Sequence, residues 1–145
     1  MAERAEIAHP LPHASWETRG YWEGTGRGEI VLQRNRTTGL VQHKPRGVCV
    51  DTLSADDLEY FVASGRGTVY TFTVTNQNQA TGFAEACPYV MAYVDLDEGP
   101  RLLTNIVGCE PDDVAIGMAV VADFVSQERD DGEQFAVPVF RPADT

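Results

Sequence analysis

GRGTVYTFTVTN, residues 65–76, is the stretch that decides the fold class. Its apolar side chains Tyr70, Phe72 and Val74 alternate with threonines, and this period of two in a run rich in aromatic and β-branched residues is typical of a β-strand. Gly65 and Gly67 predict a bend or bulge where the strand begins. Four more stretches downstream have strand character, namely PYVMAYVDL (88–96), RLLTNIVG (101–108), GMAVVADFVSQ (117–127) and QFAVPVF (134–140).

The strand count and the connections indicate a small closed barrel. DEGP (97–100) and ERDDGE (128–133) are predicted hairpin turns, and a longer connection separates the third strand from the fourth. Five strands in one open sheet would leave two bare edges, whereas closure removes them. We therefore expect a mainly β protein in which residues 58–145 form a five-stranded OB-type Greek-key barrel.

Upstream of the barrel the sequence predicts two smaller parts. In residues 27–57, EIVLQR (29–34) and LVQHK (40–44) are expected to pair as a hairpin around the turn NRTTG, where Gly39 can adopt a positive φ. Residues 1–26 are expected to begin as a loose tail. A short helix is predicted near residues 15–26, although its three glycines weaken it, and the aromatic residues there are expected to pack onto something: Trp16, Tyr21 and Trp22.

Charge and composition exclude several classes of protein. The 145 residues carry a net charge of −11, divided into +2 for residues 1–50 and −13 for residues 51–145. So acidic a barrel repels phosphate backbones, which argues against nucleic acid as the partner. No apolar run reaches the roughly 18 residues of a membrane helix, and no secretory signal is visible. An odd number of dispersed cysteines, Cys49, Cys87 and Cys109, predicts reduced thiols and a cytoplasmic protein.

The predicted hairpin is the most basic part of this acidic chain. Within that stretch Glu29 is the only acidic residue beside five cationic residues. Such a patch can contact phosphates or an acidic partner, and the alternative is a solvated face that keeps a thin hairpin soluble. The cationic residues are Arg27, Arg34, Arg36, Lys44 and Arg46.

We find no catalytic motif in the sequence. The three histidines lie away from any recognisable nucleophile, and the carboxylates cluster in predicted turns, where they favour turn formation and solubility. The cysteines are expected to be buried structural thiols. On the barrel, Tyr70, Phe72 and Tyr93 together with Met91 are candidates for a ligand-binding face, and the alternative is that at least two of these four belong to an ordinary core.

An ordered set of motifs resembles a known family. WEGTGRGEIVLQRN (22–35) is similar to the family's entry helix and first ribbon strand, NRTTG (35–39) lies where the family has C-x-x-C-G, and PRGVCVDT (45–52) lies where it has P-R-x-x-C-P-x-C. ASGRGTVYTFTV (63–74) and VPVFRPA (137–143) resemble its first and last barrel strands. The family combines a rubredoxin-like zinc ribbon with an OB-fold and accompanies thiolase-like enzymes, including sterol-carrier-type thiolases, that act on acyl-CoA.

The resemblance implies a metal site that this chain has lost. The four positions where the family keeps zinc-binding cysteines are Asn35, Thr38, Cys49 and Thr52. Asn and Thr are not zinc ligands, and a lone thiolate does not hold a structural zinc ion. We therefore expect no zinc and no cofactor bound by this chain alone.

The resemblance also implies a function. We expect a non-catalytic subunit that stabilises a thiolase-like partner and helps to form its CoA or substrate entrance, for thiolysis, retro-aldol cleavage or acyl transfer in sterol or lipid degradation. The basic hairpin and Trp22 are the candidate contacts to the partner or to CoA. The alternative function is a free-standing OB-fold module for a small ligand or single-stranded nucleic acid.

Overall fold

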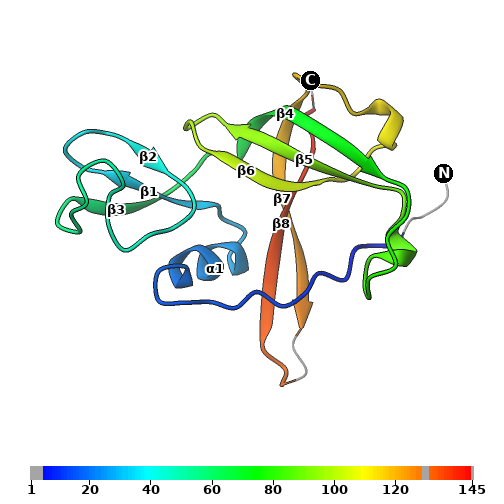
Figure 1. Ribbon diagram of the computed structural model, residues 1–145, viewed down its shortest axis with the longest axis horizontal. Helices are drawn as coiled ribbons and strands as arrows, with labels where there is room; N and C mark the ends of the chain where they lie inside the picture. Colours follow the sequence, from blue (N-terminus) through cyan, green and yellow to red (C-terminus); the bar gives the residue numbers. More distant parts are fainter. Residues whose placement is uncertain (1–4, 129–130, 145) are drawn as a thin grey trace.

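The computed structural model describes residues 5–128 and 131–144 and divides into a five-stranded barrel and a small three-stranded sheet (Figure 1). Residues 129 and 130 of the predicted ERDDGE turn therefore lie outside the described residues. The helices and strands are, in order, α1 (Arg19–Gly26), β1 (Val31–Asn35), β2 (Val41–Gln42), β3 (Leu58–Val62), β4 (Arg66–Thr75), η1 (Ala84–Ala86), β5 (Tyr89–Leu96), β6 (Arg101–Ile106), η2 (Pro111–Asp113), β7 (Ala119–Glu128) and β8 (Gln134–Pro142).

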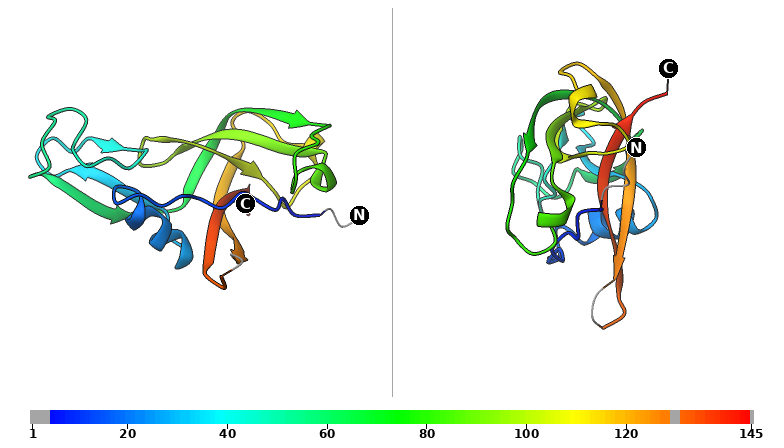
Figure 2. Two further views of the ribbon diagram at one scale, coloured as in Figure 1. Left: turned by 60° about the horizontal axis from the view of Figure 1, so that its bottom comes forward. Right: turned by 90° about the vertical axis from the view of Figure 1, so that its right-hand side faces the viewer.

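The barrel confirms the fold predicted from the alternating strands. Its strands close in the order β4-β5-β6-β8-β7, with β4 returning to pair with β7, so the sheet has no free edge. Only the β6–β8 pair is parallel, and it rests on one register pair, Ile106 with Phe140. Phe140 is fully buried in the core, together with apolar residues from the inner faces of the other strands. The β7–β8 hairpin projects beyond the barrel in two views (Figures 1 and 2).

A β-bulge in β4 changes which side chains face the core. The register between β4 and β5 shifts between Val69 and Thr71, so Tyr70 and Thr71 both point outward. Phe72 then returns to the inside and packs against the core. The expectation that Tyr70 and Phe72 share one face is therefore wrong, although the bulge was predicted at this end of the strand.

The three-stranded sheet is formed by β2, β1 and β3 in that order, all antiparallel. The expected hairpin around NRTTG is confirmed, with Gln33 paired to Gln42. The strand β3, however, pairs with β1 from Val31 to Asn35 rather than joining the barrel. The barrel thus begins at Arg66, and the boundary predicted at residue 58 must move past β3.

The helix α1 forms despite its glycines, and one of them is required. A Cβ on Gly24 would lie 2.4 Å from Cγ2 of Val31, so only glycine allows the helix to approach β1 this closely. Tyr21 is buried, whereas Trp22 is partly buried against the core. The expected packing is therefore confirmed for Tyr21 and Trp22, which join the core shared by the small sheet and the barrel, whereas Trp16 is 70% exposed.

The N-terminal segment, predicted to be loose, is fixed to the barrel at Ile7 and Ala8, while most of the other side chains in residues 5–14 are exposed. The backbone N–H of Ala8 donates to the carbonyl of Gly82 at 3.0 Å, and Nε2 of Gln127 donates to the carbonyl of Ile7 at 3.0 Å. Ile7 is buried beneath these contacts. Among the described residues, no helix has the length and apolar character needed to cross a membrane.

Candidate partner-binding site

The fold supplies one arginine of the basic hairpin with an acidic partner that the local sequence does not show. Nε of Arg34 lies 2.8 Å from Oε1 of Glu59 on β3, and its guanidinium stacks 4.4 Å from the ring centre of Phe61. Arg36 donates to the backbone carbonyl of Asp56 at 3.0 Å, and Arg27 pairs with Glu29 at 3.2 Å. Glu29 is the acidic residue within the stretch itself, and the fold adds Glu59 from β3.

Lys44 and Arg46 keep their charges available. Neither forms an ion pair within the part of the chain that the structure describes. Arg46 lines a shallow hollow beside Trp16, whose ring lies against Gly47. Trp22 is less available, because it is partly buried and packs edge-on against Tyr21 with ring centres 5.1 Å apart. The segment around Lys44 and Arg46 is thus the part of the predicted basic patch that has no ion pair among the described residues.

The four positions interpreted as former zinc ligands meet in space. Nδ2 of Asn35 donates to Oδ1 of Asp51 at 3.0 Å and to Oγ1 of Thr52 at 3.4 Å, while Oγ1 of Thr38 donates to Oδ2 of Asp51 at 2.6 Å. Oδ1 of Asn35 accepts from the N–H groups of Thr37 and Thr38. Hydrogen bonds therefore hold the two turns together, with Asp51 as a residue that sequence reasoning missed.

The electrostatics of this cluster favour a charged Asp51 and a neutral Cys49. Hydrogen bonds from Thr38 and Asn35 lower the pKa of Asp51, which favours its carboxylate. Burial and the nearby Asp51 and Asp57 raise the pKa of the Cys49 thiol and so favour its neutral form. No group of three or more His, Cys, Asp or Glu side chains suited to a metal occurs among residues 5–128 and 131–144.

Two buried glutamines, also missed in the sequence, hold the loop that carries Lys44 and Arg46. Gln33 donates to the carbonyl of Arg46 at 2.7 Å and accepts from its N–H at 2.8 Å. Gln42 donates to Gln33 at 2.8 Å and to the carbonyl of Val48 at 3.0 Å. Because such buried amides are costly to leave unpaired, they place this irregular loop in one conformation.

The barrel carries exposed aromatic and apolar side chains, but they differ from the predicted set. Tyr70 and Tyr93 are exposed, and Leu103 lies opposite Tyr93 on β6. Arg101 stacks on the ring of Tyr70 and pairs with Asp95. Phe72 belongs to the core side, as noted above, so two of the three predicted face residues lie on the surface.

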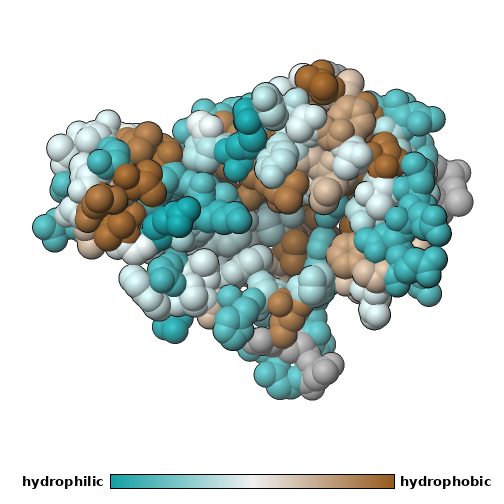
Figure 3. Space-filling view, viewed as in Figure 1, coloured by the Kyte–Doolittle hydropathy of each residue, from teal (hydrophilic) through white to brown (hydrophobic). Residues whose placement is uncertain are grey.

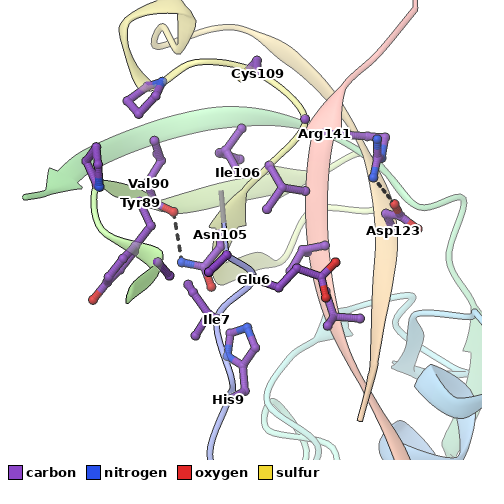
Figure 4. A pocket seen from close by; sticks show the side chains of 18 of the residues that line it. Glu6, Ile7, His9, Tyr89, Val90, Asn105, Ile106, Cys109, Asp123 and Arg141 are labelled. Carbon is purple, nitrogen blue, oxygen red and sulfur yellow. Dashed lines mark hydrogen bonds and ion pairs between the residues drawn. The ribbon is translucent and has the colours of Figure 1, made fainter. Parts of the chain in front are cut away.

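A cavity of about 400 Å³ lies where β6 diverges from β8 (Figure 4). Ile7 and His9 reach into it from the N-terminal segment, and burial lowers the pKa of His9. Asn105 donates to the carbonyl of Val90 on one wall, and Arg141 pairs with Asp123 on the other. The arrangement offers space for a small ligand between these walls.

A closed five-stranded OB barrel with an attached three-stranded sheet defines the structural class of this chain, and similarity to known proteins identifies its family. The family model described as the ChsH2 C-terminal OB-fold domain matches residues 61–125. A DUF35 domain-containing scaffold protein of Methanocaldococcus jannaschii is 37% identical over 105 residues, which cover 71% of this chain and 74% of the scaffold protein. The chain belongs to the DUF35 domain family.

Other similar proteins are parts of enzymes named for acyl-CoA chemistry. A probable enoyl-CoA hydratase alpha subunit of Thermomonospora curvata is 33% identical over 97% of this chain and 42% of that subunit. A 3-oxo-4,17-pregnadiene-20-carboxyl-CoA hydratase alpha subunit of Mycobacterium tuberculosis is 36% identical over 79% of this chain. The chain spans 35% of that subunit, so it matches less than half the length of both hydratase subunits.

One solved structure resembles nearly the whole chain. It is a chain of the Ltp2-ChsH2(DUF35) aldolase, with a TM-score of 0.78 and 33% sequence identity. The match covers 91% of this chain and 98% of that chain. The three-stranded sheet and the barrel are thus both shared with a protein solved as part of an aldolase.

Proposed function

We propose that this chain is a non-catalytic accessory subunit of a thiolase-like enzyme complex that acts on acyl-CoA thioesters. The observation that carries the proposal is the likeness to the Ltp2-ChsH2(DUF35) aldolase over 91% of the chain. The named relatives support an acyl-CoA thioester, and one of them supports a steroid side chain, as the acyl group. Bond making or breaking, by retro-aldol cleavage, thiolysis or acyl transfer, would belong to residues of the partner.

The chain's own contribution is to stabilise the partner and to shape the entrance for CoA. Lys44 and Arg46 support this role, because their charges are unpaired among the described residues and two buried glutamines hold their loop. Arg27, Arg34 and Arg36 contribute less, since their guanidinium groups are already hydrogen-bonded within the chain. CoA is expected in the complex only, and the complex is expected in the cytoplasm.

An activity assay of the complex tests this proposal. The thiolase-like protein encoded beside this chain should be purified alone and with the chain, and its turnover of an acyl-CoA thioester measured. We expect turnover, or its stability over time, to depend on the chain. Equal rates and equal lifetimes with and without the chain would contradict the accessory role.

The cavity supports a second candidate function, a free-standing module for a small ligand. Its volume of about 400 Å³ falls within the range of small-molecule sites. Single-stranded nucleic acid is less compatible, because residues 66–145 carry four Arg or Lys against thirteen Asp or Glu. A gel shift with labelled single-stranded DNA and RNA at low salt should show no complex. A retarded band would instead favour a module that binds nucleic acid.

A further inference from the structure

The two turns at the end of the three-stranded sheet have the same backbone geometry but different residues at the critical position. In the first, the N–H of Gly39 donates to the carbonyl of Asn35 at 2.8 Å, and in the second the N–H of Leu53 donates to the carbonyl of Cys49 at 2.8 Å. Both positions have a left-handed backbone, with φ of 80° at Gly39 and 58° at Leu53. The first turn uses the residue suited to this conformation, and the second does not.

Leu53 is the only non-glycine residue with positive φ among the described residues. Its Cβ makes the left-handed conformation strained, whereas glycine or asparagine adopts it readily. The strain is not offset by packing within this chain, because Leu53 is 77% exposed and is the most exposed large hydrophobic residue in the described ranges. Because no packing within the chain offsets the backbone strain at Leu53, we expect its side chain to contact another molecule.

Leu53 lies at an apolar tip of the three-stranded part, and that part carries no net charge as a whole. Figure 3 shows hydrophobic side chains gathered on the end of the molecule that carries β1, β2 and β3. Leu40 and Val50, from the same two turns, are 42% and 45% exposed. Residues 27–62 carry five basic and five acidic residues, whereas residues 66–145 carry a net charge of −9. A partner can therefore approach this end without the repulsion that the barrel exerts on an acidic protein.

The tip is also held rigidly. The hydrogen bonds from Asn35 and Thr38 to Asp51 tie the first turn to the second, and Gln42 accepts from the N–H of Val50 at 2.9 Å. A preorganised backbone loses little freedom on binding, so burial of the side chain that it presents contributes more to affinity. These are the properties of an anchor residue at the centre of an interface.

We propose that Leu53, flanked by Leu40 and Val50, is the anchor by which this chain docks into an uncharged apolar pocket on its protein partner. The inference rests on the proposed function, and it adds the contact that the sequence and the resemblance did not assign. A second copy of the chain is a less suitable occupant, because two chains of net charge −11 repel each other.

The substitution Leu53→Asn tests the proposal because it separates strain from binding. Asparagine tolerates positive φ and removes the apolar side chain. We expect the variant alone to melt at the same temperature as the wild type or higher, and its affinity for the thiolase-like protein encoded beside this chain to fall by about tenfold to a hundredfold, as for a buried leucine lost from an interface. Ile116→Asn is the matched control, since Ile116 is 69% exposed on the barrel, and it should bind as the wild type does.

Affinity by calorimetry and mass by light scattering distinguish the outcomes. If the wild type binds and Leu53→Asn binds equally well, the anchor is refuted and the accessory role stands. If the wild type itself does not bind, the proposed function fails. If Leu53→Asn lowers the melting temperature, the leucine serves the fold and the proposal is overturned. If the wild type is a dimer that Leu53→Asn dissociates, the occupant is a second copy and the partner pocket is refuted.

Discussion

The substitution Asn35→Ala tests whether side-chain hydrogen bonds, in place of a metal, hold the two turns together. Asn35 is 1% exposed and its amide serves four groups. It donates to Asp51 and Thr52 and accepts from the N–H groups of Thr37 and Thr38. Truncation to alanine leaves the two N–H groups and the Asp51 carboxylate without this partner. Since each such loss costs about 1 kcal/mol net, the expected destabilisation is about 2–4 kcal/mol.

Thermal unfolding followed by circular dichroism measures this effect. For a chain of this length a loss of 1 kcal/mol lowers the melting temperature by about 3 °C, so we expect a decrease of about 6–12 °C. Asn76→Ala, at an exposed position after β4, is the control and should leave the melting temperature unchanged. A melting temperature of Asn35→Ala within about 1 °C of the wild type would refute the reasoning, because the cluster would then contribute nothing. A chelator should not alter the wild-type curve.

Three further predictions address the electrostatics and the interpretation that a zinc site has been lost. Burial and the nearby Lys44 lower the pKa of His43 to about 4, so below pH 6.5 the unfolded chain binds a proton that the folded chain excludes. The free energy of unfolding should therefore be highest above about pH 6.5 and fall by about 2–3 kcal/mol towards pH 4. In chemical denaturation His43→Phe should reduce this dependence on pH, and an unchanged dependence would assign the loss to another group. Lys44→Glu combined with Arg46→Glu should weaken the affinity for the partner, or that of the complex for CoA, as measured by calorimetry. Unchanged affinities would show that this segment contacts neither the partner nor CoA. Cysteines restored beside Cys49 should create a one-to-one thiolate site visible as a cobalt absorption band, and its absence would contradict the interpretation of a lost zinc ribbon. The three substitutions are Asn35→Cys, Thr38→Cys and Thr52→Cys.

Much of the fold follows from local sequence pattern. The alternation in β4–β8 and the turn residues between them predict the barrel, because side-chain periodicity and turn chemistry act over a few residues. The local pattern places β3 in the barrel, but β3 pairs with β1 in the small sheet, because this pairing depends on residues about 25 positions away. The bulge at Tyr70 was suggested by neighbouring glycines, but its consequence, an outward Tyr70 with an inward Phe72, depends on the register with β5.

The candidate site was less predictable because its partners are distant in the sequence. The basic character of the hairpin is visible in the composition, yet Glu59, which neutralises Arg34, comes from another strand. The convergence of Asn35 and Thr52 was inferred from the family resemblance, whereas the participation of Asp51 was not. The strained backbone of Leu53 has no local sequence signal, since leucine does not favour positive φ.

The most direct test of the account is whether this chain forms a defined complex with a thiolase-like protein. The two proteins should be co-expressed with an affinity tag on the thiolase-like protein only, and the purified material examined by size-exclusion chromatography with light scattering at micromolar concentration. The account predicts co-elution in one peak, with a mass that fits a fixed ratio of the two chains. Separate elution of both proteins at their individual masses would contradict it.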